Sequence, residues 1–206
     1  IRAPWKFTPF SGKVKTARGT AVSVFLEKEN SPLLSRDFVV SVLQKHFLPL
    51  FLNEFQQKIF RFVYTKGVSF FVEGEPAAPP EIFSRTIGLE SFPINLKGQR
   101  THVAGWGVLA KSRDGLPENL KGIAVSTYGK VIKRGWEWLG LDLGGSFLFG
   151  IVEMPCLAEI LTTNKSDFLQ NQASLKKYYK WRKAIQESLL PVLARLGVEM
   201  PLAQKQ

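Results

Sequence analysis

A long amphipathic pattern near the end of the chain constrains the fold more than any other feature. From Ser174 to about Leu196, apolar residues recur at helical spacing, and Lys176, Lys180 and Lys183 occupy the opposite side. Such a stripe predicts a helix that covers an apolar surface. Pro191 predicts a kink in this helix. The apolar members of the stripe are Leu175, Tyr178, Trp181, Ile185, Leu189, Val192 and Leu196.

Four stretches before this helix are rich in β-branched and aromatic residues and therefore predict strands. They are residues 101–110, 122–128, 130–138 and 146–154. The turn at Tyr128 and Gly129 predicts a tight hairpin between the second and third of them. A mixed sheet backed by the long helix follows, so the fold class is predicted to be α+β.

The first half of the chain has its own strand and helix signals. Residues 19–28 predict a strand. Ser35 as cap and Asp37 in the first turn predict the start of a helix, and Pro49 is expected to end or bend it. The apolar face of this helix comprises Val39, Val42, Leu43, Phe47 and Leu50. Residues 58–64 and 68–74 predict a β-hairpin.

A proline-rich segment, "GEPAAPPE" at 74–81, predicts a linker, because proline fits neither a strand ladder nor a helix interior. We therefore predict two units, residues 1–75 and residues 76–206. The chain begins at Ile1 with a basic, strand-like stretch. We interpret it as a piece of a longer protein.

Composition limits the partners. The 206 residues carry a net charge of +11 and a pI of about 9.8. This charge excludes an acidic mimic of a partner and permits a polyanion partner such as a nucleotide, a nucleic acid or an anionic membrane. No apolar run is long enough to span a bilayer, so a membrane is not expected as a partner. The single cysteine, Cys156, excludes an internal disulfide and indicates a reducing compartment, the cytoplasm.

Common catalytic patterns are missing from the sequence. The two histidines, His46 and His102, lack the spacing of a metal site, and there is neither a nucleophile-elbow motif nor a phosphate loop. His46 is expected at the core or its boundary, and Cys156 is expected to be a buried, inert thiol. The lysines at 176, 180 and 183 remain candidates for nucleic-acid binding because residues 1–18 are also basic.

Glycine and tryptophan pairs predict packing rather than chemistry. Gly105 and Gly107 flank Trp106 within a predicted strand, which indicates a bulge or a close approach. Trp136 and Trp138 are predicted on one face of a strand, in the core or an interface, in preference to base stacking.

One lysine stands apart in a polar turn, "LTTNKSDF" at 161–168. The hydroxyl and amide groups of Thr162, Thr163 and Asn164 can fix such a turn through local hydrogen bonds. Lys165 is then able to reach a phosphate as a point charge. The spacing alone favours an ordinary capped turn.

Two segments resemble the GHKL superfamily of ATPases, which includes gyrase B, the ninety-kilodalton heat-shock chaperones, MutL and MORC. The first, 19–51 followed by 58–64, is similar to the end of the ATP-binding domain and matches it at Gly19, Thr20, Lys45 and His46. The second, 121–168, resembles the transducer domain that follows. Its Asn-Lys-x-Asp-Phe turn is matched by Asn164, Lys165, Asp167 and Phe168.

The resemblance implies that Lys165 contacts the γ-phosphate of ATP held by an upstream domain, with residues 74–81 as the hinge. It implies Gly19, Thr20 and Asn164 near the nucleotide, and ATP with Mg²⁺ as cofactors of the longer protein. The helix with the general-base Glu and the metal-binding Asn is absent, as is the Asp-x-Gly-x-Gly motif. The isolated chain is therefore expected not to hydrolyse ATP.

Two other interpretations stay open. One is a basic α+β module that binds nucleic acid, with a steep salt dependence. The other is a dimerisation module, since GHKL proteins commonly work as dimers and exposed aromatic residues would favour a homodimer.

Overall fold

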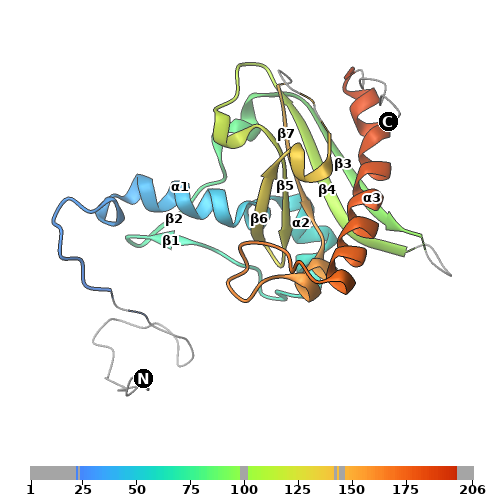
Figure 1. The fold of residues 1–206 in the computed structure, drawn as a ribbon. Helices are drawn as coiled ribbons and strands as arrows, with labels where there is room; N and C mark the ends of the chain where they lie inside the picture. Colours follow the sequence, from blue (N-terminus) through green and yellow to red (C-terminus); the bar gives the residue numbers. More distant parts are fainter. Residues whose placement is uncertain (1–21, 23, 98–101, 142, 144–146, 199–206) are drawn as a thin grey trace.

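The chain folds around a five-stranded sheet in the α+β class, as predicted (Figure 1). The computed structural model describes residues 22, 24–97, 102–141, 143 and 147–198. The strands lie in the order β3-β4-β7-β5-β6. β5 and β7 are parallel neighbours, and the other pairs are antiparallel. The strands are β3 (Thr86–Leu96), β4 (His102–Ser112), β5 (Gly122–Thr127), β6 (Lys130–Gly135) and β7 (Leu148–Glu153).

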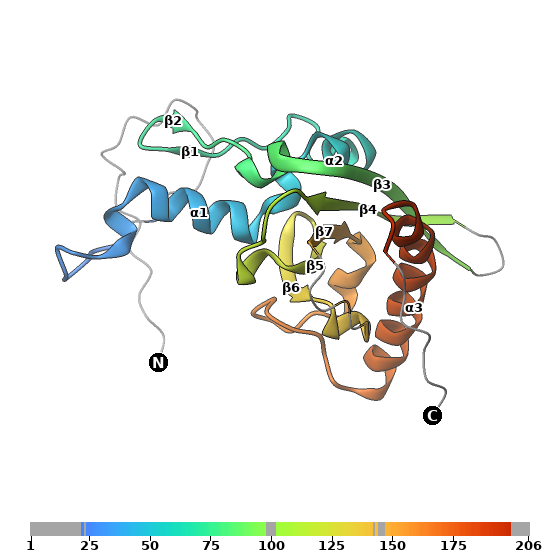
Figure 2. The same cartoon turned by 90° about the horizontal axis from the view of Figure 1, so that it is seen from above.

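Helices cover both faces of this sheet, and Figure 2 shows α3 and α2 on opposite sides. The helix α3 (Gln172–Arg195) packs the predicted apolar stripe on one face, except for Leu175, which is not part of this core cluster. The other face is covered by α2 (Asn53–Lys58) and the short 3-10 turns around it. Neighbouring residues of the central strands therefore alternate between two apolar layers, which explains why β5 and β7 are buried along their whole length.

The helix α1 (Arg36–His46) extends from the body of the molecule. Its predicted cap is confirmed, because the Ser35 side chain accepts a hydrogen bond from the Phe38 amide at 3.4 Å. The helix ends before Pro49, which lies in a buried 3-10 turn. The β1–β2 hairpin packs beside α1 and comprises β1 (Phe71–Val72) and β2 (Glu75–Pro76).

The predicted hairpin of 58–64 with 68–74 is wrong. Residues 58–64 run from the end of α2 through a 3-10 turn, and within the described stretch 58–76 the only hairpin is the short one at 71–76. Burial overrides strand propensity in this segment, because the helical path places Phe55 and Phe60 together on the sheet. Of the predicted strand 19–28, the described residues 22 and 24–28 are not in a strand; the rest lies outside the described residues.

One further strand prediction needs a smaller correction. The strand predicted at 130–138 stops at Gly135. Trp136 directly precedes a 3-10 turn and Trp138 lies in it, so the two do not share one strand face. Both are buried in the core as expected, and the Trp138 indole donates to the Ile123 carbonyl at 2.8 Å. The strand β3 lies outside the predicted strands. It is an edge strand, where the absent N–H of Pro93 is tolerated.

The close approach predicted at the Gly-Trp-Gly motif is confirmed. A Cβ atom at Gly107 would overlap the ring of Phe92, which is buried in the core beneath α3. We expect Gly107→Ala to lower the free energy of unfolding by about 1–3 kcal/mol, because a well-packed core resists added volume. Urea denaturation measures this. Gly115→Ala is the control: nothing lies within 4 Å of its added Cβ, so a similar loss there would contradict the packing explanation.

Candidate functional site

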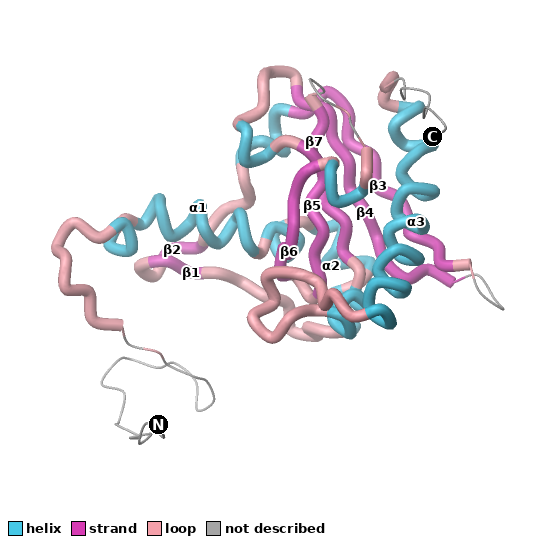
Figure 3. The backbone as a smooth tube through the Cα atoms, in the orientation of Figure 1, coloured by secondary structure: helices cyan, strands magenta, loops and turns pink. Residues whose placement is uncertain are grey.

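The turn that carries Lys165 lies between β7 and α3, next to β6 (Figure 3). Asn164 shapes it from within: its side-chain oxygen accepts hydrogen bonds from the Thr162 hydroxyl at 2.7 Å and the Ser166 hydroxyl at 2.8 Å. The Lys165 amide donates to the Thr162 carbonyl at 2.8 Å. The sequence prediction of a turn fixed by local hydrogen bonds is therefore confirmed for Thr162 and Asn164.

The backbone of Lys165 is left-handed, with φ of 54°. For a residue with a Cβ this conformation is unfavourable by roughly 1–2 kcal/mol, so the hydrogen bonds of the turn hold Lys165 in a strained backbone state. The side chain is exposed, and Lys165 lines a cavity together with Asn164 and Ser166.

An ion pair fastens this turn to the sheet. Asp167 accepts a hydrogen bond from the Lys133 ammonium of β6 at 2.6 Å, and this contact is the main reason why the pKa of Asp167 is lowered. The Lys133 ammonium also lies 5.7 Å from the centre of the Phe168 ring, and Phe168 is buried in the core beneath α3. The position of Lys165 is thus tied to β6 on one side and to the core on the other.

The cavity beside Lys165 is basic. It has a volume of about 650 Å³ and lies between the end of α1, the strand β6 and the turn. Six lysine and arginine side chains line it against two glutamates, an excess of four positive charges. The cations are Lys45, Lys121, Lys130, Lys133, Arg134 and Lys165, and the acids are Glu118 and Glu137. Lys121 is paired with Glu118 at 2.6 Å.

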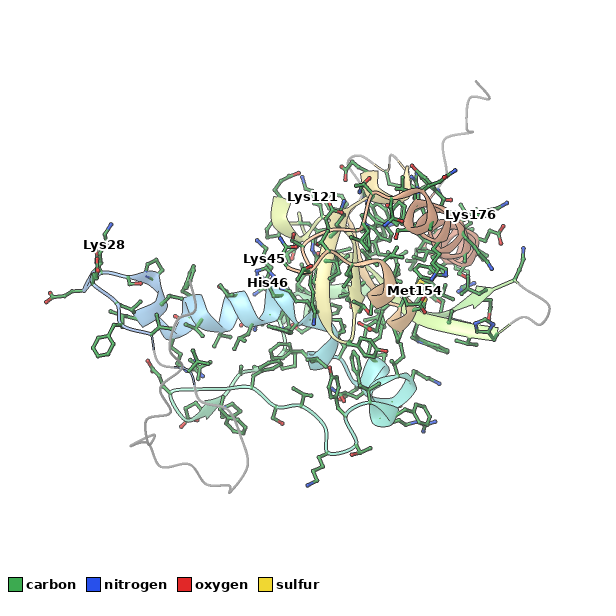
Figure 4. The ribbon with its side chains drawn as sticks, turned by 60° about the horizontal axis from the view of Figure 1, so that its bottom comes forward. Lys28, Lys45, His46, Lys121, Met154 and Lys176 are labelled. Carbon is green, nitrogen blue, oxygen red and sulfur yellow. The ribbon has the colours of Figure 1, made fainter. Side chains whose placement is uncertain are left out.

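Figure 4 shows Lys45, His46 and Lys121 close together where α1 meets the sheet, with Lys176 on another side of the molecule. The His46 ring meets β6 here: its Nδ1 lies 3.0 Å from the Lys130 ammonium. Because an ammonium group can only donate, this geometry makes Nδ1 the acceptor of a neutral imidazole. Burial, then Lys130 and Lys45, lower the pKa of His46.

Arg134 lies deeper in the same wall. Its Nη1 donates to the Leu120 carbonyl at 3.3 Å, while its Nη2 is buried without a hydrogen-bond partner among the described residues. Burial lowers the pKa of Arg134 to about 10. A buried guanidinium with an unused donor is a group that an entering anion would satisfy.

A buried carboxyl group holds the turn between β5 and β6, which directly precedes Lys130. Glu153, at the end of β7, accepts hydrogen bonds from the Ser126 hydroxyl at 2.7 Å and the Gly129 amide at 3.1 Å. Tyr128 and Gly129 both have positive φ, as a two-residue hairpin turn requires. The predicted tight turn is therefore confirmed, and Glu153 clamps it from beneath.

Burial raises the pKa of Glu153 to about 7. The folded state then holds a proton that the unfolded chain releases near pH 4.5, so the contribution of Glu153 to stability is lost as pH rises from about 4.5 through about 7. We expect Glu153→Gln to remove this dependence. From pH 4 to pH 8, the free energy of unfolding of the variant should therefore rise by about 3 kcal/mol relative to that of the wild type. Urea denaturation of both proteins across this range measures it, and parallel pH profiles would contradict it.

The structure brings together some of the predicted site residues and separates others. Asn164 and Lys165 share the cavity with Lys45 and His46, although about 120 positions separate the two pairs in the sequence. His46 lies at the boundary of the core, as predicted. Gly19 and Thr20 lie outside the described residues.

The three lysines proposed for nucleic acid lie elsewhere. Lys176, Lys180 and Lys183 are exposed on α3, opposite its apolar stripe, as the sequence predicted, and none of them lines the basic cavity. Cys156 is half-buried and not fully buried as predicted. Burial raises the pKa of its thiol to about 11, which favours the unreactive thiol form.

Sequence reasoning missed Lys130, Lys133 and Arg134. The signal was present in "KVIKRG", where three cations fall within one predicted strand. Strand alternation alone would have put Lys130 and Lys133 on different faces. The register of β6 with β5 shifts between Val131 and Lys133, which breaks this alternation, and β6 is an edge strand open to the cavity.

No described helix is both long and apolar enough to cross a membrane. Within the described ranges, no group of three or more His, Cys, Asp and Glu side chains is placed to hold a metal ion. No protein-family model matches the chain, and neither does any curated protein sequence.

Proposed function

We propose that this chain is the transducer region of a GHKL-type ATPase, together with the last part of its ATP-binding domain. In this role Lys165 contacts the γ-phosphate of ATP and so couples the nucleotide state to the orientation of the two domains. The chain does not hydrolyse ATP on its own, because the residues that would activate water and hold Mg²⁺ belong to the upstream domain.

The observation that carries the proposal is the placement of Lys165. It stands on a turn held by Asn164 and Asp167 and lines a cavity with an excess of four positive charges. Charge moves onto the phosphate oxygens during hydrolysis, and a cation fixed in advance stabilises that charge. The cavity suits a phosphate chain, because its cationic side chains can donate to triphosphate oxygens. Mg²⁺ would enter with the nucleotide.

A lysine on a second domain makes this contact depend on how the domains dock. With the phosphate in place the docked arrangement is favoured, and after phosphate release that contact is lost. Residues 74–81, the proposed hinge, include 77–80 without regular structure. Gln44 of α1 donates to the Ala78 carbonyl at 2.9 Å within this segment.

The test is ATP binding and ATP hydrolysis by a longer chain that carries the upstream domain, with Lys165 and with Lys165→Ala. Binding that is retained with slowed hydrolysis supports the proposal. The absence of nucleotide binding in the unsubstituted protein would refute it.

The exposed lysines of α3 favour nucleic-acid binding as a second candidate function. The support is weaker, because these lysines lie along an open helix face, whereas the cations around Lys165 converge on one cavity. An exposed row of lysines is also what solubility alone requires.

A further inference from the structure

We propose that the basic cavity binds oligophosphate and that His46 takes up a proton when it does so. The ligand class is a chain of phosphates, as in a nucleoside triphosphate or inorganic tripolyphosphate. This inference rests on the proposed function in taking phosphate as the anion, but its test needs neither ATP hydrolysis nor the upstream domain.

Cationic donors from distant parts of the chain converge on the cavity. Cations from four parts of the chain line one cavity: the end of α1, the segment before β5, the strand β6 and the turn at 162–167. Lys121 and Lys133 are engaged by carboxylates of Glu118 and Asp167. Lys45, Lys130 and Lys165 form no ion pair within the described residues. A cavity of about 650 Å³ with several such cations suits a polyvalent anion better than a single carboxylate.

His46 of α1 contacts Lys130 of β6 in the wall of the cavity. The ammonium of Lys130 donates to Nδ1 at 3.0 Å, so the imidazole is held neutral by a neighbouring positive charge. Lys45 adds a second cation on the same helix. Burial lowers the pKa of Lys130 as well. Both members of the pair are thus short of a counter-charge.

A phosphate beside this pair reverses the balance. Its negative charge offsets Lys130 and Lys45. The added proton goes to Nδ1, so Lys130 gives up its hydrogen bond there, and the Nδ1–H group and the Lys130 ammonium both donate to phosphate oxygens. The pKa of His46 therefore rises from its lowered value in the free protein. Linkage then requires tighter anion binding as pH falls through the interval between the free and bound pKa values, and no contribution from His46 above the bound value.

Other charged groups around His46 do not supply this counter-charge. The acids that line the cavity are Glu118, which is paired with Lys121, and Glu137. Asp167 is paired with Lys133. The β1–β2 hairpin also packs against α1 and carries Glu73 and Glu75, but neither shifts the pKa of His46. The cations that remain on the facing elements are Lys165 and Arg134.

The experiment is an NMR titration of the 206-residue chain, with and without inorganic tripolyphosphate. The sequence has only two histidines, so His102, exposed at the start of β4 and away from the cavity, is an internal reference. We expect tripolyphosphate to raise the pKa of His46 by at least about one unit. The pKa of His102 should stay unchanged.

The affinity for tripolyphosphate gives the second readout. Between pH 8 and pH 5.5 it should rise more for the wild type than for His46→Gln, by about tenfold for each unit of pKa shift. The side-chain oxygen of the glutamine still accepts from Lys130. Because protonation of tripolyphosphate affects both proteins alike, the difference between their affinities isolates the contribution of His46. An unshifted His46, equal shifts of both histidines, or identical affinity profiles would overturn the inference. A different outcome would overturn the proposed function and leave this inference intact: tripolyphosphate binds with the expected proton uptake by His46, but Lys165→Ala has no effect on ATP turnover.

Discussion

Replacing Lys165 by alanine is expected to lower kcat for ATP hydrolysis by about 100- to 1,000-fold in a longer chain that carries the upstream domain. Removal of a single fixed donor to developing negative charge has an effect of this size. ATP binding should change much less, because most contacts to the nucleotide belong to the upstream domain in the proposed arrangement. Single-turnover hydrolysis and equilibrium binding of ATP, measured on the same protein, separate the two effects.

Two variants sharpen this test. Lys165→Arg keeps the positive charge but carries it on a planar guanidinium, so this variant should retain part of the rate that Lys165→Ala loses. Lys176→Ala removes a lysine from the exposed face of α3, and it should leave kcat within about twofold of the wild type, since a solvent-exposed charge outside the cavity is screened. Equal losses at Lys165 and Lys176 would point to net charge and not to a placed lysine.

Phe60→Ala should lower the free energy of unfolding by about 3–5 kcal/mol, the usual result of emptying a buried aromatic site. Phe60 is fully buried, and its ring centre lies 6.4 Å from that of Phe55 and 5.7 Å from that of Tyr64. Because domains of this size are stable by only about 5–15 kcal/mol, this is a large share of the total. Chemical denaturation followed by tryptophan fluorescence measures the loss.

The neighbouring Phe62 is the matched control. Its side chain is 70% exposed, so Phe62→Ala should change stability by less than about 1 kcal/mol. If the two substitutions had equal effects, the buried position of Phe60 would be contradicted.

The same experiment bears on the division at residues 75 and 76. Phe60 packs in one apolar cluster with Val108, Ala124 and Ile151 of the sheet. We therefore expect the wild type to unfold in one transition and Phe60→Ala to shift that transition as a whole. An additional early transition in the variant would indicate that residues 48–76 open separately from the sheet.

The sequence by itself determined the elements whose patterns are long or chemically distinctive. The stripe of α3 has seven apolar positions at helical spacing, so its buried face follows from the repeat. The Ser35 cap and the Tyr128–Gly129 turn depend on residues that satisfy or permit a particular backbone geometry. The same holds for the turn around Lys165, where short polar side chains bond to their own backbone.

The tertiary structure decided what local pattern left ambiguous. Residues 58–64 have strand-like composition, but burial of Phe60 against the sheet favours a helical path. The basic cavity also depended on the fold: α1 supplies Lys45 and His46, and β6 supplies Lys130, Lys133 and Arg134. A sequence pattern reports only on neighbours within a few residues, whereas a cavity assembled from distant segments exists only after strand order and helix packing have set their distances.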